Sequence, residues 1–250
     1  MFGHITHQAI YSLKFRASEF KVYLGETAVT NYWFVTHDLP SYRQEPDKIG
    51  RGLEGAKRDK VFKGIRKGDR VVYYAKKKIF AGIFKVVSDL YLSSKRVYGA
   101  QANRVYVYDL EPIFVLSTEN PVQIDPADYG FEHKQRTVVK LNHEQYRNVV
   151  MDILGMAEPR SENGVISLFS KIHKELGFPF LKVVSDKFPD CIALNYRNKE
   201  IRLEFEKKSS DFEAHGHDPR KCDYIVCWTN DLGTLAPAGV IELREIIFGH

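Results

Sequence analysis

Cysteine is scarce in this sequence, and long hydrophobic runs are absent. The 250 residues contain three cysteines, an odd number without the spacing of a disulfide framework. Cys191, Cys222 and Cys227 each lie in or beside an apolar run, as reduced core thiols do. No run approaches the roughly 20 apolar residues that span a bilayer, and the N-terminus lacks the basic-then-apolar order of a secretory signal. We therefore expect a soluble, cytoplasmic protein that makes no membrane contact.

Positive charge is in modest excess, with a formal net charge of +5. Its distribution is uneven, because residues 51–78 contain 11 Lys and Arg residues against three acids. Such a cluster is typical of a phosphate-binding surface, and a solvated face is the alternative. The total charge does not distinguish the two, since mildly basic proteins without a nucleic-acid role are common.

Length and hydrophobic content predict two domains, because 250 residues with 44% hydrophobic residues can bury a sizeable core. Short aromatic and β-branched runs predict strands of a small closed or half-closed sheet at residues 32–35, 70–74, 79–87, 104–110 and 113–116. We expect a domain at 30–155 that ends in a helix at 142–154, and then a linker at 156–161. Residues 1–29 stay unassigned, as an arm or an extra strand.

Residues 162–250 predict a compact α/β domain. An amphipathic helix is expected to open at Glu162 and to close at Gly177. Its apolar residues fall at helical spacing: Val165, Leu168, Phe169, Ile172 and Leu176. Strands are expected at 181–184, 191–195, 201–206 and 224–228, followed by a further element at 241–247.

Acidic residues share one face of the strand expected at 201–206. Apolar and charged residues alternate there: Ile201, Leu203 and Phe205 alternate with Arg202, Glu204, Glu206 and Lys208. Neighbouring carboxylates repel one another unless they are solvated, protonated or bridged by a cation such as Mg²⁺. Phe188-Pro189-Asp190 supplies a further carboxylate just upstream. The pattern indicates a metal site, and a solvated face of ordinary salt bridges is the alternative.

An acid at the start of a helix, then Pro-Asp, then a strand with acid-x-acid or acid-x-Lys resembles the PD-(D/E)xK nuclease superfamily, which includes many restriction enzymes. The resemblance spans residues 162 to about 232 and implies that Asp190 and Glu204 are the metal ligands. They would hold Mg²⁺, with Mn²⁺ as a substitute. Glu206 then stands where the family usually has Lys. In the alternative register Glu206 is the second carboxylate and Lys208 takes the lysine position; we favour the first, because Phe205 is the apolar residue normally found between the two sites.

The chemistry that this resemblance implies is metal-dependent hydrolysis of a phosphodiester bond. The cation lowers the pKa of a water molecule, and the resulting hydroxide attacks phosphorus in line with the leaving oxygen. Glu206 or Lys208 is expected to orient that water. Glu162, at the start of the helix, is expected to extend the metal site.

Histidines and cysteines follow this strand and invite a zinc interpretation. His215, His217, Cys222 and Cys227 could be nominated as ligands, but their spacing matches no standard zinc site, and Cys227 lies in an expected core strand. We expect instead that His215 or His217 contacts DNA phosphate or orders the acidic residues. Plain surface histidines are the alternative.

Three motifs of the first half resemble the EVE family of the PUA-like superfamily, over roughly residues 30–155. They are Asn31-Tyr32-Trp33-Phe34-Val35, Lys67-Gly68-Asp69-Arg70-Val71-Val72-Tyr73-Tyr74 and Ala81-Gly82-Ile83-Phe84-Lys85-Val86-Val87-Ser88. The Gly-Asp pair is expected to form a turn that feeds a strand, and Ala81-Gly82-Ile83 to let a second strand pass close to that strand. The resemblance implies a β-barrel with flanking helices that binds nucleic acid and reads modified bases in an aromatic-lined pocket.

A modified base can be read when its edge and faces are accessible, which favours flipping it between aromatic rings. We nominate four residues for such a pocket: Trp33, Thr36, Tyr42 and Tyr74. Core packing is the alternative for each of the aromatic residues. Four residues of the basic cluster are expected to hold phosphates beside the pocket: Lys57, Arg58, Lys76 and Lys77.

A modified-base reader joined to a metal-dependent nuclease resembles a type IV, modification-dependent restriction endonuclease. We expect an α+β protein with a PUA-like barrel and a restriction-endonuclease-like α/β domain built on a mixed central sheet. Its partner would be DNA with a modified base, a modified cytosine above all. Cutting both strands usually takes two active sites, so we expect a homodimer. The alternatives are a PUA-like DNA- or RNA-binding protein without cleavage, and an RNA-directed nuclease.

Overall fold

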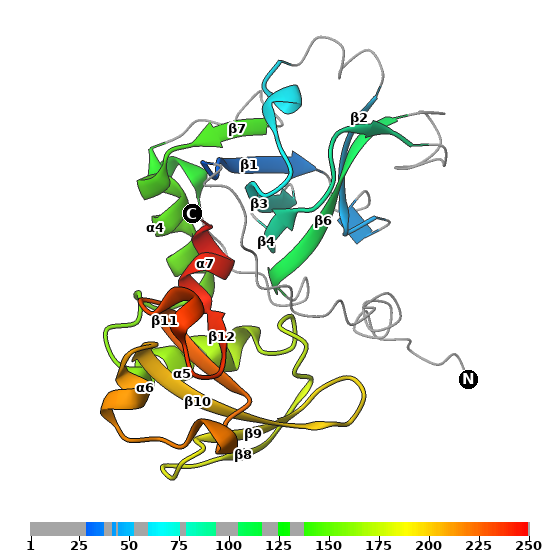
Figure 1. Ribbon diagram of the computed structural model, residues 1–250. Helices are drawn as coiled ribbons and strands as arrows, with labels where there is room; N and C mark the ends of the chain where they lie inside the picture. Colours follow the sequence, from blue (N-terminus) through cyan, green and yellow to red (C-terminus); the bar gives the residue numbers. More distant parts are fainter. Residues whose placement is uncertain are drawn as a thin grey trace, which may run out of the picture.

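Two β-sheets and few helices make up the described part of the chain (Figure 1). The computed structural model describes residues 29–37, 42–43, 45–52, 60–75, 79–93, 105–116, 125–130 and 138–249. The strands of the first sheet all lie before residue 142, and those of the second all lie after residue 179. The arrangement is a mixed α+β fold, with a curled, half-closed first sheet and a mixed second sheet, and in that outline it agrees with the expected fold class.

The first sheet has seven strands, of which β1 and β3 run parallel and the other pairs antiparallel. They are β1 (Tyr32–His37), β2 (Lys48–Gly52), β3 (Arg70–Ala75), β4 (Ile79–Val86), β5 (Tyr91–Leu92), β6 (Val105–Val115) and β7 (Val138–Leu141). The sequence did not predict β2, β5 or β7. The two strands expected at 104–110 and 113–116 are one strand, β6, in which Pro112 is accommodated beside a shift of register against β4.

The turn prediction for this sheet is confirmed, and β4 passes beside β3 as expected, with Gly82 paired to Tyr73; the close approach that requires a glycine at position 82 is to β6. Gly68 has a φ of +97° and precedes Asp69, which feeds β3. Gly82 has a φ of +151°, and a Cβ atom there would overlap the carbonyl oxygen of Phe114 on β6. A glycine at position 82 therefore lets β4 and β6 approach closely. Two short 3₁₀ helices, η1 (Phe62–Gly64) and η2 (Pro126–Tyr129), connect the strands.

Helix α4 (His143–Leu154) follows the first sheet, at the position that its sequence predicts. Its N-terminus is a capping box, in which Asn142 and Gln145 each accept a hydrogen bond from the other's backbone NH. Helix α5 (Glu162–Ile172) begins after Ser161 as expected, but it ends earlier than the expected Gly177. The chain continues through turns to that glycine, which has a φ of +90°.

The second sheet has five strands in the order β12-β11-β10-β9-β8, with parallel and antiparallel pairs. Its elements are β8 (Phe180–Val184), β9 (Cys191–Leu194), β10 (Glu200–Lys208), α6 (Asp211–Ala214), η3 (Pro219–Lys221), β11 (Tyr224–Thr229), η4 (Gly233–Leu235), β12 (Gly239–Glu242) and α7 (Leu243–Phe248). The element expected at 241–247 is thus the end of a strand followed by a helix. The mixed central sheet agrees with the expectation for this half.

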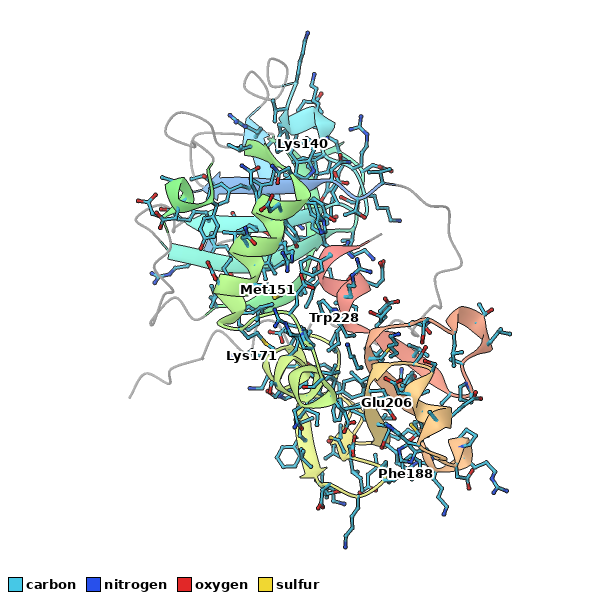
Figure 2. All side chains as sticks on the ribbon, turned by 90° about the vertical axis from the view of Figure 1, so that its left-hand side faces the viewer. Lys140, Met151, Lys171, Phe188, Glu206 and Trp228 are labelled. Atoms are coloured by element: carbon cyan, nitrogen blue, oxygen red, sulfur yellow. The ribbon has the colours of Figure 1, made fainter. Side chains whose placement is uncertain are left out.

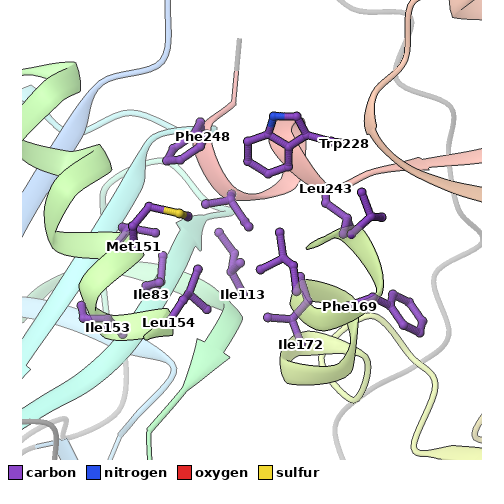
Figure 3. Close-up of a cluster of buried hydrophobic side chains, with 14 of the residues drawn as sticks. Ile83, Ile113, Met151, Ile153, Leu154, Phe169, Ile172, Trp228, Leu243 and Phe248 are labelled. Atoms are coloured by element: carbon purple, nitrogen blue, oxygen red, sulfur yellow. The ribbon is translucent and has the colours of Figure 1, made fainter. Parts of the chain in front are cut away.

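One hydrophobic core joins the two sheets. Residues from β4, β6, α4, α5, β11 and α7 pack into a single buried cluster (Figure 3). The hydroxyl of Tyr146 donates to the carbonyl of Ile247, 3.0 Å away, and so ties α4 to α7. The predicted linker, 156–161, contributes to the packing, because Pro159 is buried and lies close to Gly164 of α5. Both halves of the chain therefore share their packing across this junction.

The described helices are short compared with the length that a bilayer-spanning helix needs. The longest described helix, α4, has 12 residues, and a bilayer-spanning helix needs about 20. In the part of the chain that the structure describes, no helix is long and apolar enough to cross a membrane.

Candidate functional site

Strand β10 presents its two central glutamates on the face opposite the main core. Leu203 and Phe205 point into that core, where the Phe205 ring lies 5.1 Å from the ring of Phe169 on α5. Glu204 and Glu206 alternate with them and are 3% and 1% exposed. A solvated strand face is therefore excluded for these two carboxylates, which α6 and the segment after it cover.

The salt bridges suggested as the alternative for this face do not form as expected. Arg202 pairs with Asp223 instead, through Nε to Oδ2 and Nη2 to Oδ1, both at 3.0 Å. Asp223 also accepts a hydrogen bond from the Arg202 backbone NH at 2.8 Å. This pair fixes β10 against the start of β11, and it leaves Glu204 and Glu206 to other partners.

Asp190 and Glu204 interlock across neighbouring strands. The backbone NH of Asp190 donates to Oε2 of Glu204 at 3.0 Å, and the backbone NH of Phe205 donates to Oδ2 of Asp190 at 3.1 Å. The antiparallel pairing of β9 with β10, in which Cys191 faces Leu203, brings the two acids together. The proposed metal ligands thus lie side by side on one part of the sheet.

Two histidines from the segment after α6 close over these acids. Nδ1 of His215 lies 3.0 Å from Oε1 of Glu206, and Nε2 of His217 lies 2.9 Å from Oε1 of Glu204 and 3.8 Å from Oε1 of Glu206. The His217 ring stacks on Phe188, with centroids 4.4 Å apart and an interplanar angle of 5°. Figure 2 labels Glu206 and Phe188 in this region, away from Trp228 at the junction of the sheets.

The carboxylates raise one another's pKa. Burial raises the pKa of Glu204 to about 7, and the charges of Asp190, Glu206 and Glu162 contribute to that increase. Burial likewise raises the pKa of Glu206 to about 7, although the hydrogen bond with His215 opposes the shift. The pKa of Asp190 is raised by burial and by Glu162. We call Glu162, Asp190, Glu204 and Glu206 the carboxylate cluster; its oxygen donors and mutual repulsion fit a hard divalent cation.

Glu162 and Lys208 differ in how they relate to this cluster. Glu162, the first residue of α5, is half-buried and close enough for its charge to shift the pKa of all three other acids. Lys208 is exposed at the end of β10, where its backbone NH donates to Asp211 at 3.0 Å. Of the two candidates for the lysine position, Glu206 is the buried one, and it contacts His215 and His217.

The cysteines do not join the histidines. Cys222 and Cys227 are buried in a small apolar cluster with Phe212 and Ile225. Burial raises the pKa of the Cys222 thiol to about 12, and it also raises that of Cys227. Since zinc binds the thiolate, these positions do not suit the ligand set that includes the cysteines.

The four residues nominated for a base pocket lie on two different faces of the first sheet. Trp33 and Tyr42 belong to one buried cluster, whereas Tyr74 belongs to the core shared with the second sheet. Thr36 pairs with Tyr74 across β1 and β3, and it points to the face opposite Trp33 because the two are three residues apart on one strand. The structure therefore does not bring these four residues into one pocket.

The ring of Trp33 is held as part of the structure. It is 3% exposed, and its indole NH donates to Oδ2 of Asp69 at 2.7 Å. The nomination of Trp33 as a base-stacking residue needs an open ring face, which this buried position does not offer. Thr36 is different: it is 7% exposed, and its Oγ1 has no hydrogen-bond partner among the described residues.

The basic cluster at 51–78 is only partly described. Lys57, Arg58, Lys76 and Lys77 lie outside the described residues. Arg70 is 2% exposed, and its guanidinium donates to the carbonyls of Gly68, Glu245 and Ile246. This arginine therefore joins β3 to α7 and does not contribute to a phosphate-binding surface.

Sequence reasoning missed the aromatic residues that support the histidines. Phe188 and Phe212 both pack against His217, with ring centroids 4.4 and 5.4 Å from it. The available signal was an aromatic residue directly before Pro-Asp and a second one in the segment that follows β10. Alternation within one strand cannot reveal such contacts, because they depend on how the loops fold back.

No family model matches this sequence, and no curated protein matches it. Among solved structures, part of the chain is similar to an ASCH protein from Zymomonas mobilis, to human THYN1 in complex with 5-methylcytosine containing DNA, and to the YTH domain of Zygosaccharomyces rouxii MRB1 in complex with N6-methyladenosine RNA. Their identities are 11%, 12% and 11%, with TM-scores of 0.33, 0.35 and 0.35. The matches cover 48%, 52% and 51% of this chain, and 93%, 100% and 89% of those chains. The ligands named are those of these proteins.

Proposed function

We propose that this chain is a modification-dependent DNA endonuclease. The half of the chain that contains the first sheet would recognise a modified base, and the carboxylate cluster would hydrolyse the DNA backbone with Mg²⁺. The observation that carries the proposal is the interlocked pair of Asp190 and Glu204, buried beside Glu206 and two histidines. Buried acids that raise one another's pKa lower the stability of a fold. Such groups are typical of functional sites.

Asp190 and Glu204 would hold the cation, and Mn²⁺ would serve in its place. When bound, the ion would polarise the phosphate and lower the pKa of a water molecule. Glu206 would fill the lysine position, and together with His215 it would orient the attacking water. A pKa of about 7 for Glu206 suits a group that takes up a proton near neutral pH. Glu162 would add negative charge at the edge of the cluster.

The recognition of a modified base, a modified cytosine above all, rests on the resemblance of residues 30–155 to the EVE family. Thr36 and Tyr74 face the same side of β1 and β3 and remain the nominees for contact with the base. The Oγ1 of Thr36, which has no hydrogen-bond partner within the described ranges, supports this choice, because a buried hydroxyl without a partner costs free energy unless a ligand satisfies it. Two copies of the chain would cut the two strands of a duplex.

Cleavage of defined substrates tests the proposal. Wild-type protein, Asp190→Asn and the exposed control Asp128→Asn are incubated with Mg²⁺ and plasmid carrying modified or unmodified cytosine, and with matched RNA. We expect wild type and the control to cut modified DNA, and Asp190→Asn to leave it intact. No cutting of any substrate by wild type would favour a binding protein without cleavage, and cutting of RNA alone would favour an RNA-directed nuclease.

A further inference from the structure

Beside Asp190 and Glu204, a second group of side chains has the geometry of a metal site. Glu206, His215 and His217 each offer one ligand atom, and these atoms all lie within 4.8 Å of one another. Oε1 of Glu206 lies 3.0 Å from Nδ1 of His215 and 3.8 Å from Nε2 of His217. Ligand atoms bound to zinc at about 2.1 Å in a tetrahedron lie about 3.4 Å apart. The two separations bracket that value.

We propose that Glu206, His215 and His217 form a binding site for a zinc-class divalent transition ion, adjacent to the Mg²⁺ position at Asp190 and Glu204, where Oε1 of Glu204 lies 2.9 Å from Nε2 of His217. Two imidazoles and one carboxylate make a donor set that zinc accepts and that Mg²⁺, which prefers oxygen ligands, does not. The cysteines take no part, since they are buried in the apolar cluster around Phe212.

Two of the three ligands, Glu206 and His217, are held in place by the fold itself. Glu206 is 1% exposed on β10, and the strand pairing with β11 sets it opposite Cys227. The ring of His217 is fixed by Phe188, stacked at 4.4 Å, and by Phe212, at 5.4 Å.

One side of the site is open. The side chain of His215 is 50% exposed, whereas those of His217 and Glu206 are 21% and 1% exposed. An ion can therefore enter past His215 and keep a position for water on the solvent side, as in zinc sites with three protein ligands. An ion at this position would withdraw Glu206 and His215 from orienting the attacking water. Zinc binding can be measured without DNA, so the site and the nuclease proposal can fail separately.

Calorimetric titration of ZnCl₂ into the metal-free full-length chain tests the site. We expect one ion per chain, and at least tenfold weaker binding in His215→Gln and in His217→Gln. Asp128→Asn, at an exposed position in η2, and Cys222→Ala are the matched controls and should keep the wild-type affinity. Thermal unfolding of each metal-free variant shows that it is folded.

Cobalt(II) gives a second readout that does not depend on affinity. Nitrogen and oxygen ligands alone produce weak visible bands, whereas a cysteine ligand adds an intense near-ultraviolet charge-transfer band. We expect the weak bands in wild type and their loss in His215→Gln. No zinc binding by wild type, wild-type affinity in either histidine variant, or a thiolate band would overturn the assignment.

Discussion

Each sheet buries an aspartate where a strand begins, and the two are held in opposite ways. Asp69, 2% exposed before β3, accepts hydrogen bonds from the backbone NH groups of Asn31 and Arg66, from the Asn31 amide and from the Trp33 indole. Asp190, 8% exposed before β9, accepts one from Phe205 and lies among other acids. A carboxylate surrounded by donors stabilises a fold, whereas one surrounded by carboxylates is suited to hold a cation.

The largest expected effect is on cleavage, at Glu204. Glu204→Gln removes a proposed metal ligand and should lower Mg²⁺-dependent cleavage of modified DNA by at least about 100-fold. The same change removes a buried charge, so in EDTA at pH 8 the variant should be at least as stable as wild type. Initial cleavage rates and urea denaturation measure the two effects. A variant that cleaves normally, or that unfolds easily, would make Glu204 a structural acid like Asp69.

The opposite pattern is expected at Asp69. Asp69→Ala leaves the Trp33 indole NH and two backbone NH groups without their acceptor. We expect a loss of about 3 kcal/mol in the free energy of unfolding, measured by urea denaturation. Asp128→Ala, at an exposed position in η2, is the control and should change stability by less than about 0.5 kcal/mol. Equal stability of the two variants would refute the structural role of Asp69.

The junction between the two regions gives a smaller effect. The guanidinium of Arg70 donates hydrogen bonds to a carbonyl of the turn at Gly68 and to carbonyls of α7. A Lys side chain has a single nitrogen and cannot reach both places in this geometry. Arg70→Lys should lower the free energy of unfolding by about 1–2 kcal/mol in a single transition, because the two sheets share a core. Fluorescence and circular dichroism follow the transition. Two separate transitions in wild type would show that the halves unfold independently.

The smallest expected effect concerns a buried acid outside the carboxylate cluster. It separates the effect of burial on a carboxyl pKa from the effect of neighbouring carboxylates. Glu175, in the turns after α5, has its pKa raised to about 7 by burial, without another acid among the causes. Its pKa is about 4.5 in the unfolded chain, so the folded state binds the extra proton and stability is lost as pH rises from about 4.5 to about 7. Glu175→Gln should therefore match wild type near pH 4.5 and exceed it at pH 8.

Thermal unfolding across this pH range measures the difference for Glu175. Mg²⁺ should not change the gap between wild type and Glu175→Gln, because this residue lies outside the carboxylate cluster. A gap that closes when Mg²⁺ is added would mean that clustering of acids is not what distinguishes the proposed cation site.

Sequence alone predicted most of the second sheet, because its signals are local. The alternation in β10 placed Glu204 and Glu206 on one face, and Pro-Asp followed by acid-x-acid drew attention to Asp190. The packing of Phe188 and Phe212 on His217 was not predictable in this way. Contacts between loops depend on the whole fold, which strand periodicity does not describe.

The first sheet was predicted less well, for reasons that the residues make clear. Lys48–Gly52 lacks the aromatic and β-branched run that predicts a strand, and it forms β2 by pairing with β6. Aromatic residues were numerous enough to suggest a pocket, but aromatic character does not tell core from surface. The alternation of side chains along a strand was informative, since Trp33 and Thr36 are three residues apart on one strand and must face opposite sides.

Diffraction from crystals soaked in Mn²⁺ would show whether Asp190 and Glu204 bind one divalent cation. We expect an anomalous difference peak within bonding distance of carboxylate oxygens of both Asp190 and Glu204, and no such peak in Asp190→Asn crystals. A peak elsewhere, or none at these two side chains, would contradict the proposal that they hold the catalytic cation.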